Sequence, residues 1–157
     1  MIEDMVVAQV KSCYPERDLE NFRGFDLLYS FGSAVDALIY SSLFWPKFIR
    51  IEGMFFLEHI VETDGDIDKV RRHRRNSGSD IKTEMAFNNI EVSALFCGDD
   101  SNRASVSLLA KVISECWRAK LNDLSESPYE VHMQAQEDDV FLVFHKIANT
   151  VPANVAT

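Results

Sequence analysis

The sequence predicts an α+β fold in which helices pack on one face of a mostly antiparallel four- to five-stranded sheet. Apolar residues recur at helical spacing in the N-terminal part and over residues 103–124. They alternate with polar residues from residue 47 and again near the C-terminus, as in half-buried strands. A chain of 157 residues, of which 46% are hydrophobic and 26% charged, can bury a sufficient core of its own. We therefore expect one domain over residues 1–147 and a flexible tail over residues 148–157.

Two helices are predicted in the N-terminal part. The chain opens with residues that recur at helical spacing, namely Ile2, Met5, Val6, Gln9, Val10 and Cys13. This helix is expected to stop at Pro15, and residues 16–21 form a short polar helix or turn. Helical spacing returns over residues 25–45, with an interruption at Gly32-Ser33 that supplies an N-cap and an end at Pro46. The buried face of this second helix is expected to contain Val35, Leu38, Ile39 and Ser42.

After Pro46 the period of the pattern changes to two. One face of the predicted strand would contain Ile49, Ile51, Phe55 and Leu57, and the other face Arg50, Glu52 and Glu58. Gly53 lies between the two halves, so this segment is either one bent strand or a hairpin.

Two short helices and a strand are expected next. Residues 66–75 predict a helix that is closed by Gly78. Residues 80–88 predict a second helix with its N-cap at Asp80. Apolar and polar residues then alternate over residues 90–96, which indicates a strand.

Residues 97–102 form a loop by composition, and the clearest helix of the chain follows over residues 103–124. Its continuous apolar stripe consists of Val106, Leu109, Ala110, Ile113, Cys116, Trp117, Leu121 and Leu124. Two strands are predicted after it, over residues 129–136 and 140–147, and the acidic turn Glu137-Asp138-Asp139 joins them.

The register of this terminal hairpin decides whether two histidines meet. Pairing Gln136 with Val140 gives a continuous apolar face and places His132 and His145 on opposite faces of the sheet. A register shifted by one residue would bring the two histidines together, but it would add Lys146 to the apolar face. We therefore expect no histidine pair.

The net charge favours some classes of binding partner and disfavours others. Sixteen Lys and Arg against 25 Asp and Glu give a net charge of −9. Nucleic acid is disfavoured as the main partner, because phosphate binding depends on clustered Lys and Arg. The same charge favours a basic protein partner, although it could equally serve solubility alone.

The sequence gives no support for a membrane protein, a disulfide-bonded protein or the common motif-defined classes of enzyme. No segment is apolar over the about 18 residues that a membrane helix requires, and no basic residues precede an apolar run at the N-terminus. Cys13, Cys97 and Cys116 form no CxxC pair, which predicts a cytoplasmic protein without disulfides. Motifs of nucleophilic hydrolases, P-loops and dinucleotide-binding proteins are absent, so we expect no cofactor and no catalytic residues.

One acidic run resembles the beginning of a metal-binding loop. Asp64 and Asp66 begin a calcium-loop pattern, but its sixth position is Lys69 and its twelfth is Arg75, where an EF-hand requires Gly and Glu. A calcium site is therefore not expected, whereas a magnesium site at the two aspartates stays open. The basic run over residues 71–75 favours a helix whose arginines pair with acidic residues one turn earlier, rather than an anion site.

Three groups of acidic residues lie in predicted loops and turns, where function concentrates. They comprise Glu62, Asp64, Asp66 and Asp68; Asp99 and Asp100; and Glu137, Asp138 and Asp139. If these turns meet at one end of the sheet, they form one surface that binds a basic protein. Ordinary solvated turns are the alternative.

Residues 44–57 (FWPKFIRIEGMFFL) and residues 84–92 (EMAFNNIEV) carry a resemblance. They are similar to segments of small bacterial proteins that have a helical N-terminal half and an antiparallel sheet. Some proteins of that kind are immunity proteins, which neutralise a toxin delivered by a neighbouring cell. The shared segments are structural, so the resemblance transfers no functional residue.

We expect a non-enzymatic acidic protein that recognises a basic protein partner, most concretely an immunity protein that neutralises a bacterial toxin. The alternative is a small metal-dependent enzyme or ligand-binding domain with a pocket between helix and sheet, in which Asp64, Asp66 and His59 hold the metal. A homodimer is a third possibility, since Phe55, Phe56 and Phe141 supply more apolar sheet surface than one layer of helices covers.

Overall fold

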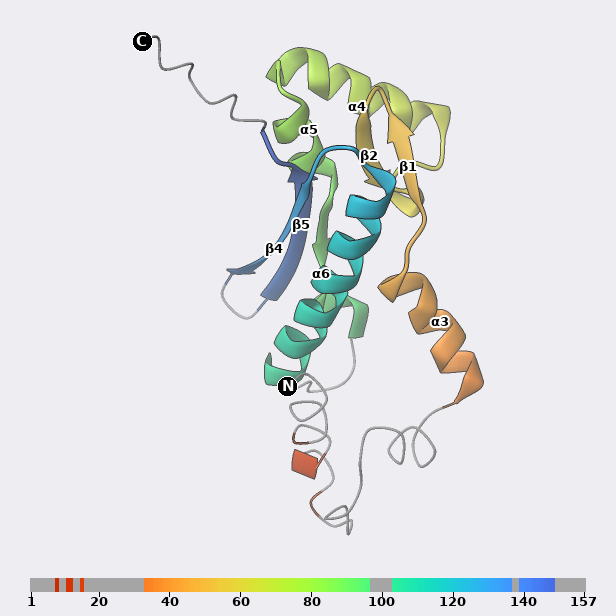
Figure 1. The fold of residues 1–157 in the computed structure, drawn as a ribbon, viewed down its shortest axis with the longest axis vertical. Coiled ribbons are helices and arrows are strands. Elements are labelled where there is room, and N and C mark those ends of the chain that lie inside the picture. Colours follow the sequence, from red (N-terminus) through yellow and green to blue (C-terminus); the bar gives the residue numbers. More distant parts are fainter. Residues whose placement is uncertain are drawn as a thin grey trace.

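The computed structural model describes residues 8, 11, 12, 15, 33–96, 103–136 and 139–148. Its elements are α3 (Ala34–Phe44), β1 (Phe48–Ile51), β2 (Met54–Leu57), η1 (Glu58–Ile60), α4 (Asp64–Ser77), α5 (Asp80–Phe87), β3 (Asn89–Glu91), η2 (Ser93–Phe96), α6 (Arg103–Leu124), β4 (Tyr129–Gln136) and β5 (Asp139–Lys146). The predicted α+β class is confirmed (Figure 1). Apart from helical residues 8, 11 and 12, the predicted N-terminal helix lies outside the described residues. So do residues 16–21, the loop over residues 97–102 and all but the first residue of the tail.

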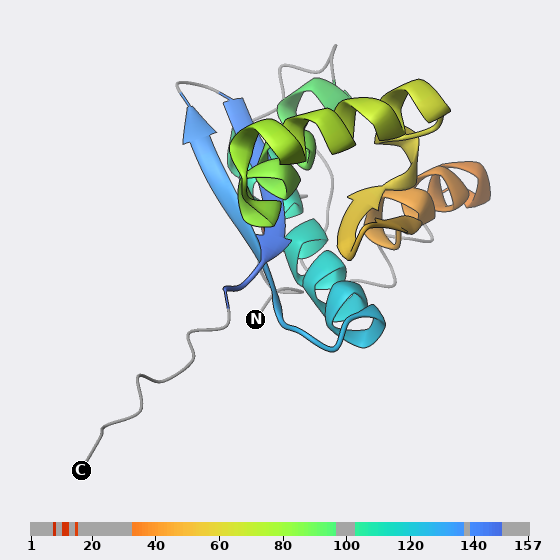
Figure 2. The same cartoon turned by 90° about the horizontal axis from the view of Figure 1, so that it is seen from above.

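The described strands form two antiparallel sheets instead of one. β1 and β2 form a hairpin, and a three-stranded sheet has the order β3-β5-β4. Figures 1 and 2 show α6 between the three-stranded sheet and α3. The main core fills the space between α6, this sheet and one face of the hairpin, and it includes Phe55, Leu57, Ala110, Ile113, Trp117, Leu121, Tyr129, Val131, Leu142 and Phe144. Within the described part of the chain, no helix has both the length and the apolar character needed to cross a bilayer.

Helix α3 ends before Pro46 as predicted, but its predicted buried face is wrong. Val35, Leu38 and Ile39 are 66%, 72% and 62% exposed, and Ser42 is exposed as well. The helix meets the core only through its last turn, where Leu43 and Phe44 pack against the main core. Trp117 Nε1 on α6 donates a hydrogen bond of 2.7 Å to the carbonyl oxygen of Leu43, which fixes this end. Because only the C-terminal turn is anchored, the apolar stripe further up the helix does not reach the core.

The segment around Gly53 is a hairpin and not a bent strand. Glu52 and Gly53 have φ angles of 51° and 89°, so both central residues of the turn are left-handed. This is the backbone of a two-residue type I′ turn, which matches the twist of paired strands and favours glycine at its second position. The turn therefore settles the alternative that the sequence left open.

The hairpin also changes which residues share a face. Ile49 pairs with Phe56 and Ile51 with Met54, and directly opposed residues point to the same side. These four side chains enter a small second core with Val61 and Val70. Phe55 and Leu57 point the other way, into the main core. The prediction that Ile49, Ile51, Phe55 and Leu57 share one face is therefore wrong, and the burial of Phe55 and Phe56 removes them from any dimer surface.

Helices α4 and α5 have well-defined caps. Thr63 is the N-cap of α4 and forms a capping box with Asp66, and Gly78 ends the helix in the left-handed conformation, as predicted. The N-cap of α5 is Ser79, whose side chain accepts from the amide of Lys82. The expectation that Asp80 caps α5 is wrong by one residue, because the Asp80 carboxylate binds Arg74 instead.

The third strand is shorter than predicted, whereas α6 has the predicted bounds. Strand β3 stops at Glu91, and η2 replaces the rest of the expected strand. Ser93 Oγ accepts from the amide of Val140 at 2.9 Å and so occupies a donor that a longer β3 would use. The predicted stripe of α6 is buried, or partly buried at Leu109 and Cys116, except at its end, where Leu124 is 47% exposed.

The register of the terminal hairpin differs by one residue from the prediction. Gln136 pairs with Asp139, so His132 lies opposite Val143, and Glu130 opposite His145. The two histidines therefore share a face, and the expectation that they lie on opposite faces is wrong. The reason is that β5 is the central strand and is apolar on both faces, so alternation did not distinguish the two registers.

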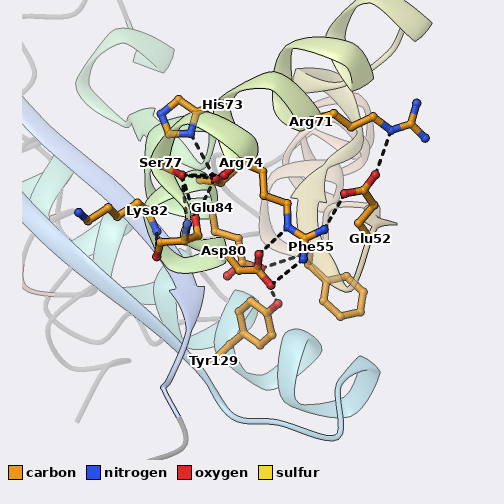
Figure 3. Close-up of polar contacts among 12 residues, drawn as sticks. Glu52, Phe55, Arg71, His73, Arg74, Ser77, Asp80, Lys82, Glu84 and Tyr129 are labelled. Carbon is orange, nitrogen blue, oxygen red and sulfur yellow. Dashed lines mark hydrogen bonds and ion pairs between the residues drawn. The ribbon is translucent and has the colours of Figure 1, made fainter.

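A buried carboxylate on α5 ties the two sheets together (Figure 3). Glu84 has no exposed surface. One carboxylate oxygen accepts from the amide of Phe55 at 3.0 Å and from the Tyr129 hydroxyl at 2.6 Å. The other accepts from the amide of Lys146 at 2.8 Å. Glu84 thus connects α5 with β2, β4 and β5.

We predict that Glu84→Ala lowers the free energy of unfolding by about 3–5 kcal/mol, because three donors lose their acceptor in a dry site and each costs about 1–3 kcal/mol. Urea unfolding followed by circular dichroism measures this. Glu126→Ala is the matched control, since Glu126 is exposed and its removal should change stability by less than about 0.5 kcal/mol. Equal losses for the two variants would contradict this role of Glu84.

Candidate functional site

The acidic residues that were predicted to bind a partner differ in their exposure and pairing in the structure. Glu62 and Asp64 are exposed just before and at the start of α4, and within the described residues neither side chain has a hydrogen bond or ion pair. Asp68 lies one turn later and pairs with Arg71 at 3.4 Å. Asp139 is exposed at the start of β5. The other four, Asp99, Asp100, Glu137 and Asp138, lie outside the described residues.

The side chain of Asp66 has a structural role. Its carboxylate accepts from the Thr63 amide at 3.2 Å and from the Thr63 hydroxyl at 2.6 Å, which completes the capping box. Lys69 Nζ donates to the same carboxylate at 2.8 Å. These contacts, the Lys69 hydrogen bond above all, lower the pKa of Asp66 to about 2. Asp66 therefore stabilises the start of α4.

Two of the four arginines in the second half of α4, Arg71 and Arg74, are paired with carboxylates, but only the Arg71–Asp68 pair lies within the helix, as the sequence predicted. Arg74 contacts Glu52 at 2.6 Å and Asp80 at 2.6 Å (Figure 3). Arg71 contacts Glu52 at 3.1 Å. The two arginines, Arg74 first, lower the pKa of Glu52. Sequence spacing did not indicate Glu52 as a partner, because it lies in the β1–β2 turn and reaches α4 only in the folded chain.

Two of the candidate surfaces lie on the same side of the molecule. Figures 1 and 2 both place α3 and the first turn of α4 on the side away from the three-stranded sheet. Strands β4 and β5 lie on the opposite side in both views, and Asp139 is the first residue of β5. The start of α4 and α3 thus share the side away from the three-stranded sheet and from β5, with α4 near the top of Figure 1 and α3 below it.

The histidine pair on the terminal hairpin is the feature that sequence reasoning missed. The rings of His132 and His145 are 5.7 Å apart at an interplanar angle of 71°. Glu130 Oε2 lies 3.7 Å from His145 Nε2. One donor atom from each of Glu130, His132 and His145 lies within 4.8 Å of the other two. The Glu-x-His spacing on β4 was the available signal, since residues i and i+2 of a strand share a face.

The metal site suggested by the acidic run is not assembled. Within the described residues, His59, Asp64 and Asp66 do not form a group of neighbouring metal donors. Asp66 is engaged by Thr63 and Lys69, as shown above. Imidazole and carboxylate donors converge instead on the hairpin of β4 and β5.

Comparisons of the chain with protein-family models, with curated proteins and with solved structures find no match. Its function must therefore be inferred from the molecule's own surfaces.

We predict a pH dependence of stability that depends on Asp66. Because folding lowers the pKa of Asp66 from 3.8 to about 2, the unfolded chain takes up this proton first as the pH falls. The stabilisation from Asp66 is complete above pH 4 and is lost between about pH 4 and pH 2. Thermal unfolding of wild type and Asp66→Asn across this range should give curves that converge as the pH falls. Asp64→Asn, at the exposed first position of α4, is the control and should run parallel to wild type.

Proposed function

We propose that the protein is a non-enzymatic binding domain that recognises a basic protein partner through the side carrying α3 and the start of α4. The observation that supports this proposal is the exposure of the α3 face, which we define as Val35, Leu38 and Ile39. These residues are 62–72% exposed and lie at positions i, i+3 and i+4 of one helix. Contiguous exposed apolar surface is typical of interaction sites, and apolar residues at positions i, i+3 and i+4 of a helix are common anchors in helix docking.

Charge supports the choice of a basic partner. Glu62, Asp64 and Asp68 are exposed at or next to the start of α4, and this end of the helix lies on the same side of the molecule as α3. The chain carries a net charge of −9, so its field attracts a cationic protein and raises the rate of encounter. The resemblance of residues 44–57 and 84–92 to immunity proteins makes a basic toxin domain the concrete candidate.

We predict that immobilised wild-type protein retains a basic protein from a lysate of the source organism, and that Leu38→Ser/Ile39→Ser retains at least tenfold less. Burying one such side chain contributes about 1.5–3 kcal/mol, and about 1.4 kcal/mol corresponds to a factor of ten. Met133→Ser is the matched control, because Met133 is 44% exposed and belongs to β4, which lies on the opposite side of the molecule. Quantitative mass spectrometry of the retained proteins provides the measurement.

Three outcomes would contradict the proposal. The retained protein could bind wild type and the double variant equally. Sedimentation could show a dimer that the double variant loses, which would assign the α3 face to a second copy of the chain. Hydroxyl-radical footprinting of the isolated monomer could find Leu38 and Ile39 protected, which would assign the face to another part of the same chain.

We also predict that association with the retained partner slows as salt rises, since charges are screened over about 8 Å at physiological ionic strength. Asp64→Asn should lower the association rate, whereas Asp139→Asn, which removes the same charge on the opposite side, should lower it less. Stopped-flow or surface-plasmon measurements from low to high salt provide the rates. An association rate independent of salt would rule out electrostatic attraction of the partner.

A further inference from the structure

The hairpin of β4 and β5 holds two imidazoles and a carboxylate in one place. Glu130 and His132 lie two residues apart on β4, and His145 is directly opposite Glu130 on β5. The three donor atoms lie within 4.8 Å of one another, although His145 is 13 residues from His132 and 15 from Glu130 in the sequence. Strands fixed by a complete ladder hold such a group more precisely than a loop does.

The hydrogen bonding of His145 leaves a lone pair directed at a carboxylate. His145 Nδ1 lies 3.0 Å from the carbonyl oxygen of Lys146, and a carbonyl oxygen can only accept. Nδ1 therefore carries the proton, and in the neutral ring Nε2 has a free lone pair. That nitrogen lies 3.7 Å from Glu130 Oε2. Two facing acceptors repel unless a cation lies between them, and this cation is either a second proton on the ring or a metal ion.

His132 has a nitrogen without a partner. Its Nδ1 is buried and makes no hydrogen bond among the described residues. Its Nε2 lies 2.9 Å from the side-chain nitrogen of Gln134. If that amide nitrogen donates, Nδ1 must carry a buried, unsatisfied proton, which is unfavourable. A metal bound at Nδ1 removes the conflict, because Nε2 then carries the proton and donates to the oxygen of the rotated amide.

The donor set selects the class of ion. Two imidazoles and one carboxylate suit Zn²⁺, which binds nitrogen at about 2.0–2.1 Å in a tetrahedral arrangement and keeps a water in the fourth position of open sites. The donors must approach to about 3.3 Å from one another to meet these bond lengths. Glu130 can make this movement, because its side chain is 54% exposed, whereas His145 is held at 13% exposure. The hydrogen bond from Nδ1 to the Lys146 carbonyl is the usual support of a metal-binding histidine.

The site has an entry path. A groove runs along β4, which is an edge strand of its sheet, and Glu130 and His132 line it together with Lys111 and Arg118 of α6. An ion can reach Glu130 from this groove, whereas the buried Nδ1 of His132 becomes accessible only when its side chain moves.

We propose that Glu130, His132 and His145 form a binding site for one zinc ion. The test uses the full-length chain without a histidine tag, dialysed against Zn²⁺ alone and analysed for bound metal. Wild type should bind one zinc per chain, and zinc should raise its melting temperature. His145→Gln and Glu130→Gln should each weaken binding at least tenfold and reduce the thermal shift. His59→Gln is the matched control, since His59 is exposed outside this group, and it should bind like wild type.

Two results would overturn the site. Wild type could bind no zinc, in which case a proton is the cation between Glu130 and His145 and the group is an ion pair. Alternatively, zinc could bind with unchanged affinity to both His145→Gln and Glu130→Gln, which would place it elsewhere. Circular dichroism verifies that each variant is folded. Glu130→Gln keeps the test decisive if His145→Gln is unstable, because Glu130 is half exposed and contributes little packing.

Discussion

The hydrogen bonds of Glu84 are the constraint on which the arrangement of the two sheets depends. A carboxylate without exposed surface loses its hydration on folding, so the fold must supply donors in place of water. The donors come from β2 in the hairpin and from β4 and β5 in the three-stranded sheet, and no ladder joins the hairpin to that sheet. Burial and then the hydrogen bond to Glu84 raise the pKa of Tyr129, which keeps its hydroxyl a donor at every physiological pH. Asn88, one turn further along the chain, adds a 2.8 Å hydrogen bond to the Phe55 carbonyl.

The sequence predicted those features that local chemistry decides. Pro46 ends α3, Gly78 ends α4 in the left-handed conformation, and the apolar stripe of α6 sets its bounds at residues 103–124. Predictions failed where contacts with an element distant in the sequence determine which side chains are buried. The stripe of α3 is exposed because only its last turn reaches Trp117, which lies 74 positions away from Leu43. The faces of β2 were misassigned because its residues are buried on both sides, so alternation carried no information.

The candidate zinc site shows how one register controls chemistry. A shift of one residue between β4 and β5 moves His145 to the other face of the sheet and away from His132. The sequence argument against the observed register was that Lys146 would join the apolar face. In the structure Lys146 ends the strand, where its side chain is half-buried and its amide binds Glu84. The free-energy cost of placing Lys146 on the apolar face, which was the basis of the prediction, is therefore small at this position. The hydrogen-bond partner of the last residue of β5 comes from α5, so the sequence of the hairpin alone does not predict it.

The two proposed sites lie on opposite sides of α6, and we expect them to be energetically independent. Helix α6 contacts both α3 and β4, yet it is one continuous helix of 22 residues with Trp117, Ile113 and Leu121 fixed in the core. Coupling between sites requires an element with two alternative arrangements that both ligands bias, and a packed helix of this kind supplies none. A bound Zn²⁺ would change the net charge only from −9 to about −7, which leaves the attraction for a cationic partner in place. Loss of zinc binding should therefore leave partner binding intact, so each proposal stands or falls on its own experiment.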